Sequence, residues 1–465
     1  MKRTTLLLLA GLASFTAFGQ DIAGSWYGSL KLSGIELRIV FHITKIDDGY
    51  TSTMDSPDQN AFGLATATTT LADSKLTILM KTPVLEYSGE LKDGIITGNL
   101  KQNGATFPMN LSKKKVEKAV VLRPQEPKPP YPYYTEEVKF RNEAAGAVLA
   151  GTLTMPSKEG KYPVVIMISG SGPQNRNEEL LGHKPFLVIA DHLTRNGIAV
   201  LRYDDRGTAQ STGDFKTATS LDFASDVEAA IDFLKGRKEI DKKKIGLMGH
   251  SEGGLIAPMV AEKSKDVDFI ILLAGPGLPG YKILLMQQEL IARAGGSSES
   301  DIEKTRKTNQ AAFDVVLKSD NVETLQPELT KFLVDELAKD PTAEIPAGMS
   351  KEDFVKSSVA QMVSPWMMYF LKYDPATSLT KVKCPVLAVN GSLDLQVPPK
   401  EDLAAIGESL KKAKNKKVTI IEFPGLNHLF QECKTGSPNE YAEIEQTISP
   451  VLLETVSNWI KQINL

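Results

Sequence analysis

The sequence predicts a small all-β, barrel-like domain followed by an α/β domain with a mostly parallel sheet. Three observations indicate this fold class. Residues 20–115 hold short segments of alternating apolar and polar residues, separated by turn signals and without a helical period. Residues 116–134 are rich in proline, which favours an extended linker. From residue 135 to residue 465, strand and helix patterns alternate, as they do where helices connect the strands of a parallel sheet.

Residues 1–19 have the features of a secretory signal peptide. Lys2 and Arg3 precede an apolar run, and the small residues Ala17 and Gly19 occupy the positions that a signal peptidase recognises. The run is too short to span a membrane comfortably, and no cysteine lies at the cleavage point to carry a lipid. We therefore expect an exported protein, periplasmic or secreted, without a membrane anchor. The formal net charge of -3 gives no reason to expect a nucleic-acid partner.

In the predicted all-β domain, short alternating segments are expected to form a meander that closes into a small barrel or sandwich. These segments are 25–32, 35–44, 50–56, 63–71, 75–80, 86–91, 95–102 and 106–111. The opening residues 24–28 resemble the first strand of lipocalin-like barrels, while a simpler interpretation is that Trp26 closes one end of a β-core. His42 lies inside an alternating segment, where we expect a structural role. The sequence does not identify a ligand for this domain.

The α/β domain is expected to open with a hairpin and then to alternate between strands and helices. The expected strands are 138–142, 148–155, 162–169, 198–203, a strand ending at residue 250, 269–274, 385–390 and 417–423. The expected helices are 186–195, 222–235, 255–263 and 444–463. Between residues 276 and 380 the strand pattern stops, and amphipathic helices are expected at 282–294, 301–317, 325–337 and 351–361.

The segment Gly249-His250-Ser251-Glu252-Gly253 stands between an apolar run and a helical pattern. This order predicts a buried strand, a tight turn and a helix, with the Ser251 hydroxyl exposed at the turn. The glycines fit because a Cβ at either position would collide with the neighbouring strand or helix. The segment resembles the G-x-S-x-G nucleophile elbow of the α/β-hydrolase superfamily, and the order of elements is similar over about 330 residues. The resemblance implies an α/β-hydrolase fold in which residues 276–380 form a helical cap over the active site.

A serine hydroxyl becomes a good nucleophile when a histidine removes its proton and an acid orients that histidine. Of the five histidines, His428 follows the last predicted strand, on a loop that reaches the same edge of the sheet as the serine. It also satisfies the superfamily's chain order of serine, acid and histidine. His183 and His192 precede the elbow. His250 is adjacent to the serine and is expected to support the turn by packing.

The acid should follow the strand at 385–390. Asp394 is the carboxylate in the turn there, within Gly391-Ser392-Leu393-Asp394-Leu395-Gln396-Val397-Pro398. This phrase resembles the acid loop of bacterial carboxylesterases, and Tyr373-Asp374-Pro375 is also similar to theirs. Asp374 is a rival, but it precedes the strand and so should lie at the opposite end of the sheet. Ser251, Asp394 and His428 are therefore the predicted catalytic residues.

Ester hydrolysis also needs amide donors for the developing oxyanion. One should be the backbone amide of Glu252, and the other should come from the small-residue loop that begins at Gly170. By analogy with relatives the resemblance implies the amide of Ser171, while Gly172 remains an alternative. The Glu252 side chain could attract an amine, although its main expected contribution is its backbone. The loop from Asp204 to Gly207 resembles one that braces the elbow in relatives, and we expect a structural ion pair there.

The predicted function is hydrolysis of carboxylic esters, with short acyl chains favoured, through an acyl-enzyme on Ser251. The resemblance covers the carboxylesterase and serine aminopeptidase-like branch, so a peptidase is the first alternative, with Glu289 of the cap as one candidate for binding an ammonium group. A binding protein without catalysis is the second alternative. The expected partner is a small ester substrate, and no cofactor or metal site is expected from the motifs. Cys384 and Cys433 are expected to be free thiols because their strands place them far apart.

Overall fold

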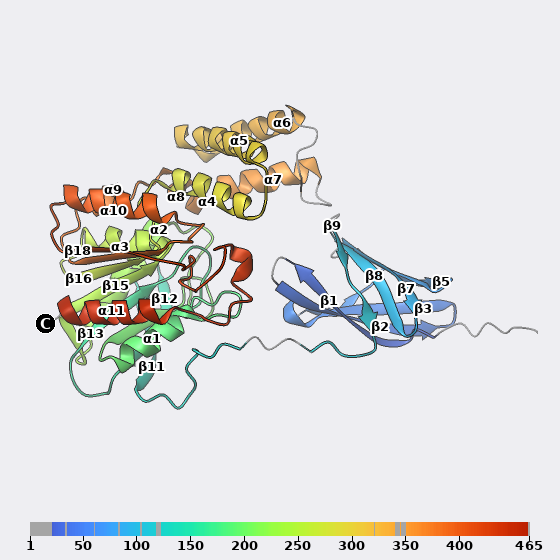
Figure 1. The fold of residues 1–465 in the computed structure, drawn as a ribbon, viewed down its shortest axis with the longest axis horizontal. Coiled ribbons are helices and arrows are strands. Elements are labelled where there is room, and N and C mark those ends of the chain that lie inside the picture. Colours follow the sequence, from blue (N-terminus) through green and yellow to red (C-terminus); the bar gives the residue numbers. More distant parts are fainter. Residues whose placement is uncertain are drawn as a thin grey trace, which may run out of the picture. The chain divides into compact units, whose positions relative to one another are not determined.

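The computed structural model describes residues 21–32, 35–59, 61–81, 84–102, 105–117, 122–319, 321–339, 345 and 350–463. The predicted signal peptide, residues 1–19, lies outside these residues, as do residues 118–121 of the predicted linker. Contacts divide the chain into two compact units, one formed mainly within residues 21–117 and one mainly within residues 122–463 (Figure 1). None of the described helices is both long and apolar enough to cross a membrane.

The first unit is an antiparallel barrel. Its ring of eight strands closes where β8 pairs with β10, and two short strands, β4 (Ala61–Ala65) and β9 (Ala105–Pro108), extend it by pairing with β3 and β8. The prediction of a small all-β, barrel-like domain is confirmed. Around the ring the strands are β1 (Gly24–Leu32), β2 (Ile35–Ile46), β3 (Gly49–Ser56), β5 (Thr68–Ala72), β6 (Lys75–Lys81), β7 (Val84–Lys92), β8 (Ile95–Gln102) and β10 (Leu111–Ser112).

The barrel interior is filled by side chains. Successive residues of a strand point to opposite faces, and the inward set forms one apolar core that includes Trp26, Phe41 and Tyr87. The indole of Trp26 donates a hydrogen bond to the Ile22 carbonyl, and the Lys113 ammonium lies 4.3 Å from its ring centre. Trp26 therefore packs within the β-core, as the simpler interpretation of residues 24–28 expected.

The second unit is built on an eight-stranded mixed sheet with the order β11-β12-β14-β13-β15-β16-β17-β18. The first two pairings in this order are antiparallel, and the strands from β14 to β18 are parallel to one another. The strands are β11 (Tyr134–Asn142), β12 (Ala147–Met155), β13 (Tyr162–Ile168), β14 (Ala199–Tyr203), β15 (Ile240–His250), β16 (Val267–Leu273), β17 (Val386–Gly391) and β18 (Val418–Phe423). The predicted α/β-hydrolase fold is confirmed.

Helices cover both faces of this sheet (Figure 1). One apolar core joins Val164 and Leu247 to α2 (Ser220–Lys235), α3 (Glu252–Ala261) and α10 (Pro399–Lys412). The other joins alternate strand residues to α1 (Pro185–Arg195) and α11 (Pro450–Ile463). Because the central strands are buried on both faces, they are apolar throughout and not alternating.

The helical cap lies between β16 and β17, as predicted. Its helices pack around an apolar core of their own that includes Phe313, Val316 and Leu329. They are α4 (Gly280–Ala294), α5 (Glu299–Lys318), α6 (Val322–Lys339), α7 (Lys351–Met362) and α8 (Pro365–Lys372). A further short helix, α9 (Ala376–Leu379), packs through Leu379 into the core of the sheet domain. Sheet strands β16 and β17 are neighbours although the whole cap separates them in sequence.

Outside the cap, two helices differ clearly from the expectation, and within it the short helices α8 and α9 were not expected. The last helix begins at Pro450 and not at residue 444, because proline disfavours a helical conformation in the residue before it and is well placed in a helix's first turn. Helix α10 was not expected, although it has charges suited to both ends, Glu401 and Asp402 first and Lys411 and Lys412 last.

The proline-rich stretch is held along the second unit from Arg123 onward. The Arg123 guanidinium donates to the carbonyl oxygens of Leu181, Gly182, Ala442 and Ile444. Gln125 accepts the amides of Thr447 and Ile448. This part of the predicted linker is therefore structurally part of the second unit.

Candidate active site

Ser251 occupies the turn between β15, which ends at His250, and α3, which begins at Glu252. Its backbone has φ 51° and ψ −117°, a conformation that non-glycine residues rarely adopt. Two glycines make the turn possible. A Cβ on Gly249 would lie 1.9 Å from the Gly253 carbonyl oxygen, and a Cβ on Gly253 would lie 2.1 Å from that of Ile168. The structure thus contains the strained serine turn that the sequence predicts.

The structure brings Asp394 and His428 together. Asp394 lies in the turn after β17, His428 follows β18, and His428 Nδ1 is 2.7 Å from Asp394 Oδ2. Both side chains are buried, and the other carboxylate oxygen, Oδ1, accepts the amides of Gln396 and Val397 at 2.7 and 2.9 Å. The backbone amides of its own loop therefore hold the Asp394 carboxylate in place, and the carboxylate orients the His428 imidazole. Asp374 instead accepts the amide of Ala376 at the start of α9.

His428 lies beside the serine turn. The ring of His250 is 4.8 Å from the ring of His428, centre to centre, and His250 Nε2 is 3.0 Å from the His428 carbonyl oxygen. Among the described contacts, no hydrogen bond joins Ser251 Oγ to His428. In enzymes without bound substrate this bond is often long.

The amide of Glu252 opens helix α3, where unpaired N–H groups face outward from the helix end. Glu252 lines a small cavity together with Gly170 and Gly172 of the predicted oxyanion loop. The Gly170 amide is already bound by Glu178 Oε1 at 2.6 Å. The second oxyanion donor therefore stays a prediction, with Ser171 and Gly172 as the two choices.

A buried carboxyl group, that of Asp205, holds this loop in place. Asp205 accepts the Ser169 hydroxyl at 2.7 Å and the Gln174 amide at 2.9 Å, so it anchors both ends of the predicted oxyanion loop. Burial, together with the charges of Glu252 and Glu178, raises the pKa of Asp205 to about 8. The sequence pattern near Asp205 suggested an ion pair, and its contact with the oxyanion loop is a role that sequence reasoning missed.

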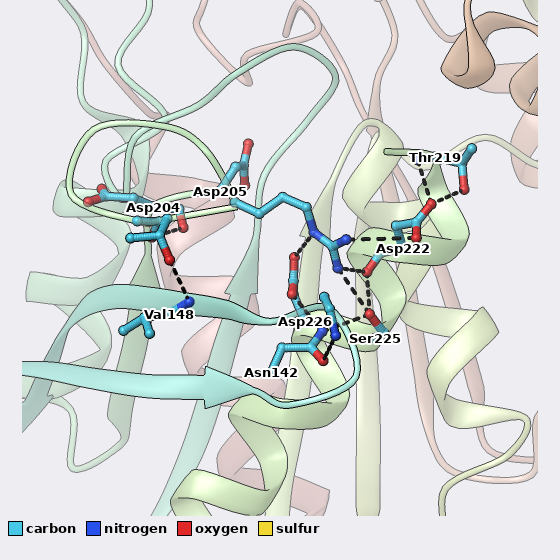
Figure 2. A network of polar contacts seen from close by, with 12 residues as sticks. Asn142, Val148, Asp204, Asp205, Thr219, Asp222, Ser225 and Asp226 are labelled. Atoms are coloured by element: carbon cyan, nitrogen blue, oxygen red, sulfur yellow. Dashed lines mark hydrogen bonds and ion pairs between the residues drawn. The ribbon is translucent and has the colours of Figure 1, made fainter. Parts of the chain in front are cut away.

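The neighbours of Asp205 do form structural ion pairs. Arg206 lies 2.7 Å from Asp226 of helix α2, and Asp204 lies 2.8 Å from Arg176. Figure 2 shows Asp222, Ser225 and Asp226 on the helix and Asn142 on the adjoining strand, all facing one polar cluster. Asn142 donates to Asp226 at 2.9 Å and closes the cluster. These contacts brace the loop that carries Asp205.

A match to a known protein family covers residues 145–421. That is more than half of the chain, and the family is the X-Pro dipeptidyl-peptidases, S15. The chain belongs to this S15 family. The matched segment begins after the barrel and ends before His428. It contains Ser251 and Asp394.

Individual proteins similar to this S15 family chain include esterases. Esterase EstD of Thermotoga maritima is 26% identical over 313 residues, which is 67% of this chain and 65% of that protein. The chain thus matches slightly less than two thirds of esterase EstD. An uncharacterized 31.7 kDa protein of Escherichia coli is 24% identical over 274 residues, 57% of this chain and 85% of that protein.

Solved structures give weaker likenesses. The α/β hydrolase GrgF from Penicillium sp. sh18 is 16% identical, with a TM-score of 0.44, over 71% of this chain and 98% of that one. The Pyrococcus furiosus esterase Pf2001 is 16% identical, with a TM-score of 0.42, over 71% and 93%.

Neither carboxylate considered for binding an ammonium group is free in this S15 family chain. Glu252 Oε1 accepts the Ser220 hydroxyl at 2.6 Å and the Trp366 indole N–H at 2.8 Å, and burial raises the Glu252 pKa. Trp366 comes from α8, so the Glu252 side chain connects the elbow helix to the cap. Glu289 faces Arg306 at 3.5 Å within the cap. The cap contact through Trp366 had no signal in the sequence.

Proposed function

We propose that this protein is an exported serine hydrolase that cleaves carboxylic esters, with Ser251 as nucleophile, His428 as base and Asp394 as the acid that orients the base. The observation that carries the proposal is the buried Asp394–His428 hydrogen bond of 2.7 Å beside a serine in a strained turn at a helix N-terminus. A hydrolase needs a nucleophile, a base and an acid that orients the base, and here the three residues come from segments far apart in the chain.

The proposed reaction follows from these positions. His428 binds Asp394 through Nδ1, which leaves Nε2 to take the Ser251 proton as the serine attacks the ester carbonyl. The carbonyl oxygen becomes an oxyanion next to the Glu252 amide and one amide of the loop after β13. His428 then returns the proton to the alcohol that leaves. Water attacks the acyl-enzyme by the same route, and Ser251 is restored.

Ester rather than peptide cleavage is favoured by the relative that is called an esterase and by the state of Glu252, whose carboxylate already has two donors. The peptidase alternative is favoured by the family's name, X-Pro dipeptidyl-peptidase. The purified protein should be compared on p-nitrophenyl acetate and butyrate and on X-Pro and aminoacyl p-nitroanilides. A higher kcat/KM on the anilides would assign the peptidase function. We expect the acetate and butyrate esters to be faster, and longer acyl esters to be slower.

Covalent labelling separates an enzyme from a binding protein. A fluorophosphonate probe should label the protein once, and the label should map to Ser251 by peptide mass spectrometry. An unlabelled, folded protein would favour the binding alternative.

Export is a proposal from residues 1–19 alone. Expression with its own N-terminus should give a mature chain that starts near Gln20, recovered from the periplasm or the medium. N-terminal sequencing and fractionation measure both, and an uncleaved chain would contradict export.

A further inference from the structure

A second histidine–carboxylate pair lies beneath the proposed active site. His250 Nδ1 is 3.0 Å from Glu178 Oε1, and both side chains are buried. The other ring nitrogen, Nε2, is 3.0 Å from the His428 carbonyl oxygen. Glu178 Oε1 also accepts the Gly170 amide at 2.6 Å. Two side chains thus connect the serine turn, the loop of the proposed base and the proposed oxyanion loop.

Close packing at Gly170 shows how tightly these segments meet. A Cβ on Gly170 would lie 3.3 Å from the Ser251 Cβ, 3.2 Å from Glu178 Oε1 and 3.6 Å from His250 Nδ1. Glu178 itself has φ 49°, which is uncommon for a glutamate. A residue keeps such a conformation when its surroundings hold it there, and strain of this kind concentrates at functional sites.

The partners of His250 determine its protonation. A carbonyl oxygen can only accept, and the Glu178 oxygen already accepts the Gly170 amide, so a ring that donates from both nitrogens satisfies every contact. Burial alone would lower the pKa of His250, but the charge of Glu178, the hydrogen bonds to Glu178 and the His428 carbonyl, and the charge of Asp394 outweigh it, and the pKa is raised.

The groups packed around the pair leave little room for water. Pro185, Phe186, Leu273, Leu429 and Phe430 line the space beside Glu178 and His250. The titratable groups that face the pair are His428 and Asp394 on the side of His250 and Asp205 on the side of Glu178. In such an apolar setting an ion pair is strong, and loss of one partner leaves the other buried and unpaired.

We propose that His250 and Glu178 are positioning residues for the hydrolytic reaction, a cation–carboxylate bridge that holds the serine turn, the His428 backbone and the Gly170 amide in register. The proposal rests on the proposed function for the roles of Ser251 and His428. Neither residue touches the substrate. Their effect is on distances between Ser251, its base and the oxyanion donors, to which kcat is sensitive: a misplacement of about 1 Å can cost about 100-fold in rate.

The bridge has a defined pH dependence. Below the raised pKa of His250 the ring carries both protons and the bridge is complete. Above it, the ring has a single N–H for two acceptors, so one contact is lost. Activity should therefore decline on the alkaline side, at a pH above the ordinary histidine pKa of about 6.5.

The test is Glu178→Gln, which keeps the size and an accepting oxygen but removes the charge. We expect kcat on p-nitrophenyl butyrate to fall about 100-fold with KM changed less than about threefold. We also expect the alkaline decline to move to lower pH by at least about one unit. Glu179→Gln is the matched control, because Glu179 is adjacent and exposed. A Glu178→Gln enzyme with the kcat and pH profile of the Glu179→Gln control would overturn the proposal, and so would a loss of melting temperature alone.

A second measurement reads the protonation of His250 directly in the unsubstituted protein. In protein labelled with ¹⁵N in its histidine rings, His250 should show two protonated ring nitrogens at neutral pH, assigned by their absence in His250→Gln. A ring with one proton at pH 7 would contradict the bridge even if Ser251 labels with fluorophosphonate. Failure of the proposed function would give a different result. In that case the Ser251→Ala variant would hydrolyse p-nitrophenyl butyrate as well as the unsubstituted protein does, whatever the protonation of His250.

Discussion

Among the described residues, two clusters bring a serine, a histidine and an aspartate near one another, one in each unit. In the barrel, Ser25 Oγ is 2.8 Å from His42 Nδ1, and His42 Nε2 is 2.9 Å from Asp55. In the α/β-hydrolase unit, Asp394 holds His428 beside Ser251. By residue type and hydrogen bonding alone, the barrel set is the more complete of the two.

Their surroundings differ. Ser25, His42 and Asp55 lie on the regular strands β1, β2 and β3, and their side chains face outward because their strand neighbours fill the core. The His42 side chain is 41% exposed and that of Asp55 is 20% exposed. The corresponding values are 5% for His428 and 0% for Asp394. Water therefore screens the electrostatic attraction in the barrel contacts more than it does in the buried Asp394–His428 contact.

The serines differ even more. Ser251 stands alone between a strand and a helix with φ 51°, next to the first amides of α3. Ser25 is within a strand, whose amides are used in the barrel's ladder. We therefore expect the hydrogen-bonded cluster of the barrel to have no catalytic activity. A buried histidine–aspartate pair, a partly exposed serine in a strained turn and the first amides of a helix distinguish the proposed hydrolytic site from a polar cross-strand cluster.

The largest expected effect tests the two serines. Ser251→Ala should lower kcat on p-nitrophenyl butyrate by about 10⁶-fold, because no other group can form the acyl-enzyme. Ser25→Ala should leave kcat unchanged within about twofold, since its hydroxyl only joins a partly exposed cross-strand cluster. Circular dichroism should show both variants folded. A loss of turnover in Ser25→Ala would give the barrel a part in the chemistry.

The next effect compares the two aspartates. Asp394→Asn should lower kcat by about 10⁴-fold, because an amide neither stabilises the imidazolium nor fixes the tautomer that Ser251 needs. The same change in the barrel, Asp55→Asn, should not alter kcat. Combined with Ser251→Ala, Asp394→Asn should add little, because the residues act as a unit. An Asp394→Asn enzyme with normal kcat would remove the acid assignment.

A third effect separates the two units. A chain that begins at Leu122 lacks the barrel but keeps Arg123 and its four carbonyl contacts, so it should fold and retain kcat within about threefold. A chain that begins at Tyr131 loses those contacts and should be less stable by about 2 kcal/mol. Urea unfolding and ester turnover measure both. An inactive but folded chain from Leu122 would show that the barrel contributes to the reaction.

The same contrast explains how much the sequence could predict. Local patterns define the barrel strands, since all except β10 pair with a strand that is adjacent in the sequence. They also define the serine turn, since its glycines lie within two residues of Ser251. Asp394 and His428 were predictable because each follows a strand whose end meets the serine's edge of the sheet.

Contacts between distant segments could not be predicted in this way. Glu178 lies 72 positions from His250, in a loop without a regular pattern, and only the folded chain brings them together. His250 was expected to support the turn by packing, and the structure adds a charged partner and a contact with His428. Trp366 reaches Glu252 across 114 positions for the same reason. The order of helices and strands along the chain does not indicate which side chains such loops place in contact.

The smallest expected effect compares the fully buried carboxyl of Asp205 with the partly exposed carboxyl of Asp55 through the pH dependence of stability. The pKa of Asp205 is raised from 3.8 to about 8, mainly by burial, so the folded protein holds a proton there that the unfolded chain releases. The contribution of Asp205 to the free energy of unfolding is therefore lost as the pH rises from about 4 through about 8. Asp55 has the opposite sign. Burial would raise its pKa, but hydrogen bonds from the Gly63 amide and His42 lower it, so its contribution is lost as pH falls.

Asp205→Asn should remove this pH dependence. The amide resembles the protonated acid, since its oxygen can accept the Gln174 amide while its NH₂ donates to the Ser169 hydroxyl. Relative to the unsubstituted protein, the variant's gain in free energy of unfolding should be smallest below about pH 4 and should grow by about 1 kcal/mol per pH unit up to about pH 8. Asp55→Asn should show no such gain at high pH. Urea unfolding of the chain from Leu122, with and without Asp205→Asn, isolates the buried group, and a gain that is equal at all pH values would mean that Asp205 stays ionised in the folded protein.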